Sequence, residues 1–143
     1  MAAGVSEPLY TRDILRLAAS LGEPGGLERV DGEAVRRSPT CGSTISVAVM
    51  MADGRVAALS QRVEACAFGQ AAAALMEAGA PGTSASEARA ALAAVERWLR
   101  GDDKAADAWP GLDVLAPARA RPGRHGAILQ PFQALAAAIE AAP

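Results

Sequence analysis

The chain has two cysteines and one histidine, whose side chains could act as nucleophiles or metal ligands: Cys41, Cys66 and His125. Cys41 lies in a turn-rich stretch over residues 38–43, and a thiol needs such an accessible position before it can react or bind a metal. Cys66 opens an alanine-rich stretch of helical character, where the first backbone N–H groups and the helix dipole stabilise a thiolate. His125 is the only histidine, and an imidazole with two thiolates is a ligand set that suits zinc.

The same three residues also have a plainer interpretation. A cysteine is often a small buried hydrophobic side chain, and a single histidine in a loop is often a solvated polar residue. The chain contains no Cys-x-x-Cys pair, so spacing alone is a weak metal signature. Two cysteines are too few for a disulfide-stabilised scaffold, and 143 residues can bury a core without such bridges. The cysteines are therefore either inert or act as free thiols.

Composition narrows the range of partners. Lys and Arg number 14 against 16 Asp and Glu, so the chain has no basic excess to neutralise a nucleic-acid backbone. Aromatic residues make up 3% of the sequence, which leaves few platforms for base stacking. No apolar stretch reaches the roughly 18 residues that span a bilayer, and residues 1–10 lack the order of a signal peptide. We expect a single domain over residues 1–143 in a reducing cytoplasm, with neither nucleic acid nor membrane as partner.

The strand signals lie in the first half of the chain. Alternation of β-branched and small residues over 44–51 predicts a strand. Asp53 and Gly54 then form a typical hairpin dipeptide, and residues 55–64 are expected to be the returning strand. A further short strand is expected near residues 33–37.

Helical spacing predicts helices over residues 10–21, 66–78, 86–100 and 125–141. Thr11 is the expected N-cap of the first helix, and residues 83–87 offer more than one capping arrangement for the third, including a capping box of Ser84 with Glu87. Pro131 is expected in a first turn or at a kink of the last helix. The buried face of the third helix is expected to hold Ala90, Ala91, Ala94, Val95, Trp98 and Leu99. The order of elements predicts an α+β fold, in which a small antiparallel sheet of about three strands has helices packed on one face.

Three stretches of the sequence resemble the motifs of one family. Residues 38–42 (Ser-Pro-Thr-Cys-Gly) resemble its first cysteine turn, and residues 64–76 resemble its second motif, a cysteine that opens a small-residue helix. Residues 124–132 (Arg-His-Gly-Ala-Ile-Leu-Gln-Pro-Phe) resemble its third motif, an Arg-x-x-Cys turn at the start of the last helix. On these matches, residues 10–139 resemble the iron–sulfur cluster assembly scaffolds of the IscU, NifU and SufU type. The long gap after residue 80 is more similar to SufU.

The resemblance implies a role for each matching residue. Cys41, beside the flexible Gly42, is the implied sulfur acceptor, and Cys66 is the implied fixed ligand. The chain departs from the family at two positions, since Ala127 stands at the third cysteine and Ser43 at the aspartate of the first motif.

With these two departures, the chain keeps only two of the four ligands that the family uses. By this likeness, zinc, iron or a 2Fe–2S cluster would be bound by Cys41, Cys66, His125 and Ser43 or a water molecule, with His125 reaching back toward the thiols. The implied partners are a cysteine desulfurase and iron–sulfur apoproteins. The implied role is a scaffold or sulfur carrier rather than a catalyst.

Two alternatives to this function stay open. A degenerate paralogue without metal could keep the fold and act as a binding or regulatory partner of the assembly machinery. An unrelated structural role is the third possibility, in which Cys41 and Cys66 would lie far apart. The basic residues Arg119, Arg121 and Arg124 would provide positive potential that holds the thiolates, dock an acidic partner, or form a solvated loop.

Overall fold

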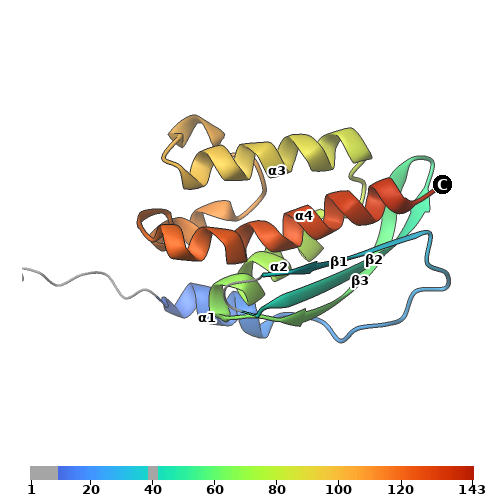
Figure 1. Ribbon diagram of the computed structural model, residues 1–143, viewed down its shortest axis with the longest axis horizontal. Coiled ribbons are helices and arrows are strands. Elements are labelled where there is room, and N and C mark those ends of the chain that lie inside the picture. The colour runs from blue at the N-terminus through green and yellow to red at the C-terminus, as the bar shows by residue number, and fades with distance from the viewer. Residues whose placement is uncertain (1–9, 39–41) are drawn as a thin grey trace, which may run out of the picture.

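A computed structural model describes residues 10–38 and 42–143, so Cys41 lies outside the described residues. The principal elements are α1 (Arg12–Ala19), β1 (Gly32–Arg37), β2 (Thr44–Ala52), β3 (Arg55–Glu64), α2 (Ala67–Gly79), α3 (Ala85–Leu99) and α4 (His125–Ala141). Short 3₁₀ helices over Asp103–Ala105, Leu112–Ala120 and Pro122–Arg124 connect α3 to α4. The predicted elements are present in the predicted order (Figure 1).

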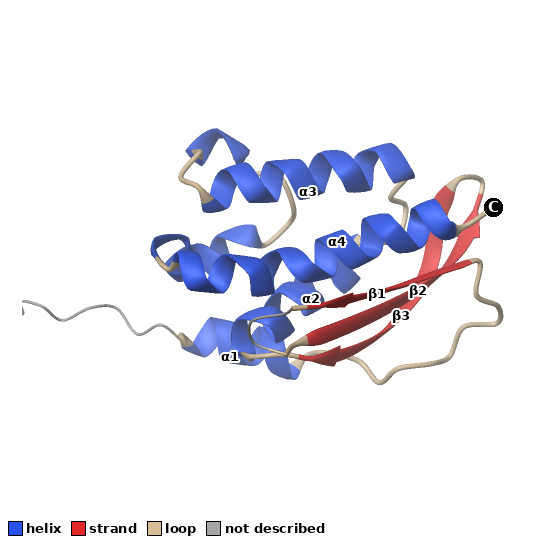
Figure 2. Cartoon of the chain, viewed as in Figure 1, coloured by secondary structure: helices blue, strands red, loops and turns tan. Residues whose placement is uncertain are grey.

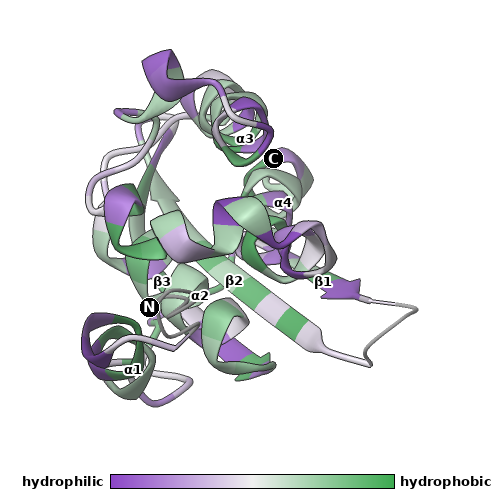
Figure 3. Ribbon diagram, turned by 90° about the vertical axis from the view of Figure 1, so that its left-hand side faces the viewer, coloured by the Kyte–Doolittle hydropathy of each residue, from purple (hydrophilic) through white to green (hydrophobic). Residues whose placement is uncertain are grey.

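The three strands form one antiparallel sheet in the order β1-β2-β3 (Figure 2). Ile45, Val47 and Val49 of the central strand are fully buried, whereas the alternate residues Ser46 and Ala48 are half-buried. A matching alternation in hydropathy is visible along β2 in Figure 3. Because successive side chains of a strand point to opposite faces, the sequence pattern dictates which face of β2 meets the core.

The turn between β2 and β3 has the predicted hairpin geometry. Asp53 has φ 53° and Gly54 has φ 75°, so both residues occupy the left-handed region. A two-residue hairpin turn of this kind needs two such residues, and Asp-Gly is among the pairs that tolerate it best. The turn therefore sets the pairing of Ala52 with Arg55.

Helices cover one face of the sheet. Helix α4 packs across β1 and β2, α2 lies beside α4, and α1 packs against α2 (Figure 1). Helix α3 packs on α4 and forms an outer layer, away from the sheet (Figure 1). The predicted α+β architecture, with a small antiparallel sheet and helices on one face, is confirmed.

The loop from α1 to β1 runs past the opposite face of the sheet. The backbone N–H of Gly25 donates to Oγ of Ser60 (2.6 Å), and the guanidinium of Arg29 donates to the carbonyl of Met51 (2.7 Å). Asp31 accepts a hydrogen bond from the backbone N–H of Met51 (2.7 Å), and this bond lowers the pKa of its carboxyl group. These bonds bring the chain to the edge of the sheet where β1 begins.

The buried face of α3 differs in part from the prediction. Val95, Trp98 and Leu99 are buried as expected, but Ala90 is exposed and Ala88 is buried in its place. Ala91 and Ala94 are half-buried. Alanine occurs all around this helix, so it does not mark which face packs on α4; the larger side chains do.

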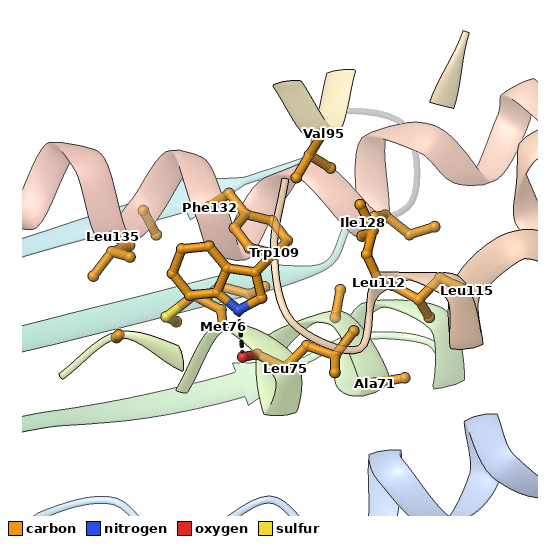
Figure 4. Packing of buried hydrophobic residues seen from close by; sticks show 14 of the residues in the cluster. Ala71, Leu75, Met76, Val95, Trp109, Leu112, Leu115, Ile128, Phe132 and Leu135 are labelled. Atoms are coloured by element: carbon orange, nitrogen blue, oxygen red, sulfur yellow. Dashed lines mark hydrogen bonds between the residues drawn. The ribbon is translucent and has the colours of Figure 1, made fainter. Parts of the chain in front are cut away.

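The core between the helices centres on Trp109, which lies in the connection from α3 to α4. Its indole N–H donates to the carbonyl of Leu75 in α2 (2.6 Å), and its ring meets Phe132 of α4 edge-on, with centroids 5.2 Å apart (Figure 4). An ideal Cβ at Gly79 would lie 2.7 Å from the indole, so this close packing depends on a glycine there. Among the helices in the described part of the chain, none has both the length and the apolar character to cross a membrane.

Candidate functional site

Cys66 lies between strand β3 and helix α2. It follows the end of β3 and is the N-cap of α2, with an extended backbone (φ −67°, ψ 173°). Its side chain makes no capping hydrogen bond, and its thiol is free and half-buried. The side-chain amide of Gln70 holds the backbone just before Cys66 against α2, because its Nε2 donates to the carbonyl of Ala65 (2.8 Å). The thiol is therefore held at the helix N-terminus without being used as a cap.

A pocket of about 320 Å³ opens beside this thiol. Its wall comes from three segments that are remote in sequence: the residues before β2, the junction of β3 with α2, and the start of α4. Besides Cys66, the lining residues that carry ionisable groups are Glu64 and Arg124. All three stretches that resemble family motifs contribute described residues to this one pocket.

Ala127 lines the same pocket and is 9% exposed. The first turns of α2 and α4 meet closely here, since an ideal Cβ at Gly69 would lie 3.8 Å from Cβ of Ala127 and 3.6 Å from its carbonyl oxygen. Gly69 is three residues after Cys66, so the two lie on neighbouring parts of one helix face. Position 127, the predicted third-cysteine position, therefore shares its pocket with Cys66.

Pro131 lies within α4 and beyond its first turn, so the first of the two expected positions, a first turn or a kink, is not the one found. The helix nevertheless continues from His125 to Ala141. Because proline has no N–H, it cannot donate to the carbonyl of Ala127, four residues earlier. The carbonyl oxygen of Ala127 thus lacks the N–H donor that a residue four positions later usually provides in a helix.

Ser43 is buried at the edge of this pocket and is hydrogen-bonded to α4. Its hydroxyl donates to Oε1 of Gln130 (2.8 Å), and Nε2 of Gln130 donates weakly to the carbonyl of Ser43 (3.5 Å). Ser43 is 6% exposed and Gln130 is 5% exposed. The hydroxyl predicted as a ligand therefore serves a buried hydrogen bond. Sequence reasoning missed Gln130, although a lone amide on the apolar side of the last helix was a usable signal.

His125 does not line this pocket. Its Nε2 lies 3.1 Å from the carbonyl oxygen of Ala118 and 3.0 Å from that of Arg119. Both partners are acceptors, so Nε2 carries a proton and donates to them. The expectation that His125 reaches back toward Cys66 does not fit this geometry, because the imidazole is bonded to the 3₁₀ helix before α4. Within residues 10–38 and 42–143, no three His, Cys, Asp or Glu side chains are grouped to hold a metal.

The basic residues singled out in the sequence have different roles. Arg119 is structural, because its Nε donates to the carbonyl of Trp98 (2.7 Å) and its guanidinium lies 4.9 Å from the Trp98 ring centroid. It also pairs with Asp103 (2.7 Å). Arg121 is exposed, and Arg124 lines the Cys66 pocket. Of the three, only Arg124 is placed to act on a group bound beside the thiol.

The fold of this chain is similar to that of proteins with known structures. No protein-family model and no curated protein matches the chain. A nitrogen-fixing NifU-like protein (N-terminal) from Brucella abortus is 34% identical, with a TM-score of 0.79 and 92% of each chain covered.

Two further structures are similar in fold at lower identity. A candidate iron–sulfur cluster assembly scaffold protein for the SUF system from Fervidobacterium islandicum AW-1 is 17% identical, with a TM-score of 0.82; the match covers 92% of this chain and 96% of that one. A hypothetical protein is 22% identical, with a TM-score of 0.81 and coverage of 92% and 97%. The chain belongs to the family of NifU-like N-terminal proteins, as its three motifs indicated.

Proposed function

We propose that this protein accepts and carries sulfur in iron–sulfur cluster assembly, working with a cysteine desulfurase. The observation that carries the proposal is the free thiol of Cys66, which lines a pocket where the three family-like stretches meet. Membership in the NifU-like family, and the likeness in fold to a SUF scaffold, support the setting of cluster assembly. Cys41 remains the predicted first acceptor, with Cys66 as the second thiol.

The proposed transfer is a thiol exchange. A cysteine thiolate of this chain attacks the terminal sulfur of the desulfurase persulfide, and the S–S bond of that persulfide breaks. The electron pair of the broken bond leaves with the desulfurase sulfur, so the step requires no external oxidant or reductant. The product is a persulfide on this chain. Arg124 lines the same pocket, and the positive charge of its guanidinium would stabilise the anionic form of this persulfide.

The test is persulfide transfer followed by intact-protein mass spectrometry. The chain is incubated with a desulfurase and cysteine, and we expect a gain of one sulfur atom per acceptor thiol, reversed by a reductant. The Cys41→Ser and Cys66→Ser variants locate the acceptor, and the double variant should gain no sulfur. If the native chain accepts no sulfur while a known acceptor does under the same conditions, the proposed function is wrong.

A second candidate function is favoured by Ala127. Ala127 lines the pocket at the position where the family has its third cysteine. A chain that lacks this thiol could regulate the assembly machinery by binding alone. Binding to a desulfurase that is unchanged in the Cys41→Ser/Cys66→Ser variant, together with no sulfur transfer to the native chain, would favour this role. Sulfur transfer that depends on the cysteines would favour the carrier.

A further inference from the structure

We infer that the Cys66 pocket does not hold a metal ion or an iron–sulfur cluster as a resident group, and that Ala127 is the residue that prevents it. This inference deepens the proposed function, on which it rests, because it makes the site a thiol site without a resident metal. The argument depends on which donor atoms the chain can bring to the pocket.

The supply of soft ligands is short. Structural zinc sites use four cysteine or histidine ligands, and 2Fe–2S clusters are usually held by four cysteines. The sequence contains two cysteines and one histidine in all. Even when Cys41 is counted, the pocket can therefore receive no more than two thiolates.

The histidine is bonded elsewhere. Nε2 of His125 donates to the carbonyl groups of Ala118 and Arg119. Turning the ring toward Cys66 would break both bonds and leave two carbonyl groups to find other donors, which costs free energy when such groups are not solvated. His125 is therefore a poor candidate for a third ligand.

The remaining oxygen donors are weak substitutes. The hydroxyl of Ser43 already donates to Gln130 inside the protein, and a metal would have to compete for this oxygen. Glu64 lines the pocket and is exposed, so its carboxylate is the one charged oxygen donor among the described lining residues. One carboxylate beside two thiolates leaves a site short of the closed four-ligand shell of a structural metal.

Position 127 is where the missing ligand belongs. Ala127 lines the pocket, and its Cβ lies near Gly69, which shares the first turn of α2 with Cys66. Because Ala127 lines this pocket of about 320 Å³, a longer side chain at position 127 would border the same space as Cys66. A cysteine placed there would add a third thiolate to the site without displacing a bonded side chain.

The test is a gain of metal binding in the full-length chain. Zinc affinity is measured by competition with a chromophoric chelator, and zinc content is measured after gel filtration. We expect the native chain to retain substoichiometric zinc. Ala127→Cys should retain about one zinc per chain and bind it at least roughly 100-fold more tightly, since loss of even an outer-shell contact costs 10- to 100-fold. Adding Cys66→Ser to that variant should abolish the gain.

Two matched variants control for the added atoms. Ala127→Ser adds an atom of similar size without a thiol, and Ala136→Cys adds a thiol to another buried alanine of α4 outside this pocket. Neither should gain zinc. The rate of thiol labelling is the second readout: zinc should protect the thiols of Ala127→Cys and leave those of the native chain unprotected. Thermal melting of each variant confirms that it is folded.

Two outcomes would overturn the inference. One is stoichiometric zinc in the native chain, bound with an affinity within tenfold of that of Ala127→Cys. If Glu64→Gln then loses this zinc, the carboxylate of Glu64 is the ligand that completes the native site. The other is a folded Ala127→Cys that gains no zinc, because position 127 would then not be the missing ligand. Sulfur acceptance is measured separately, so failure of the metal test leaves the persulfide result to stand or fall by itself.

Discussion

The hydroxyl of Ser43 lies 2.8 Å from Oε1 of Gln130, although the two residues are 87 positions apart in the chain. This hydrogen bond joins the segment before β2 to α4, next to the pocket that Cys66 and Ala127 line. Both side chains are buried, so neither has water as a ready substitute partner. The bond thereby fixes the wall of the site as well as the packing of the last helix.

Loss of this hydrogen bond should destabilise the fold. We expect Ser43→Ala to lower the free energy of unfolding by about 1–3 kcal/mol, because it leaves Oε1 of Gln130 buried without its donor. Urea denaturation followed by circular dichroism measures the change. Ser20→Ala is the matched control: Ser20 also donates to a carbonyl, that of Leu17, but it is exposed, and its loss should have little effect.

A double-mutant cycle separates this bond from other effects of the substitution. Gln130→Leu removes the buried partner, and in the Ser43→Ala/Gln130→Leu variant no partner of the pair is left orphaned. We expect the double variant to be more stable than the sum of the single changes implies, by about 0.5–3 kcal/mol. Additive losses would mean that the two side chains do not interact in solution.

Gly32 should not tolerate a side chain. An ideal Cβ there would lie 2.0 Å from the carbonyl oxygen of Ala138 and 2.9 Å from the backbone nitrogen of Ala142. Both are backbone atoms of the end of α4, so they cannot turn aside. We expect Gly32→Ala to lower the free energy of unfolding by about 1–3 kcal/mol, as overpacking generally does.

The control for Gly32 is a glycine with room around it. Gly126 lies in α4, and an ideal Cβ there meets no heavy atom within 4 Å. Gly126→Ala should be neutral or stabilise the protein by up to about 1 kcal/mol, because alanine favours the helix more than glycine does. Denaturant midpoints that place Gly32→Ala at or above Gly126→Ala would contradict the packing of β1 against α4.

Glu87 should make the stability depend on pH in the acid range. The backbone N–H of Ser84, followed by the guanidinium of Arg55, lowers the pKa of its carboxyl group below the ordinary 4.5. A carboxyl group whose pKa is lower in the folded state stabilises the fold above its unfolded-state pKa. That stabilisation is lost as the pH falls through the folded-state pKa.

This pH dependence can be measured by comparing Glu87→Gln with the native chain. Thermal melts should show the largest difference near neutral pH, and the difference should shrink as the pH falls below 4.5. Glu23→Gln removes the charge of an exposed glutamate that lies outside the helix cap and provides the control. A difference that grows toward low pH would show that the sign of this linkage is wrong.

Local features of the fold could be predicted because they depend on neighbouring residues. Thr11 caps α1 by accepting from the N–H of Ile14 (3.2 Å), and Ser84 with Glu87 forms the expected capping box of α3. The hairpin at Asp53 and Gly54 forms as predicted. A cap or a two-residue turn is decided within a few residues, so propensity and spacing suffice to predict it.

Features that depend on packing could not be predicted in this way. The spacing of His125 suited a role beside the thiols, yet the imidazole is bonded to the carbonyls of Ala118 and Arg119. The exposure of Ala90 escaped prediction because alanine fits either face of a helix. In each case the outcome depends on which segment packs alongside, and that is set by the whole chain.

The elements, their order and the three motifs that carry the family likeness could be recognised in the sequence, since these are patterns of adjacent or periodic residues. Packing in three dimensions is what brings Cys66 and Ala127 to one pocket, joins Gln130 to Ser43, and places the first turn of α4 at Ala127 beside Gly69 of α2. The physical reason is that contacts between distant segments follow from how the helices and the sheet bury their apolar faces together. No single stretch of sequence encodes that arrangement.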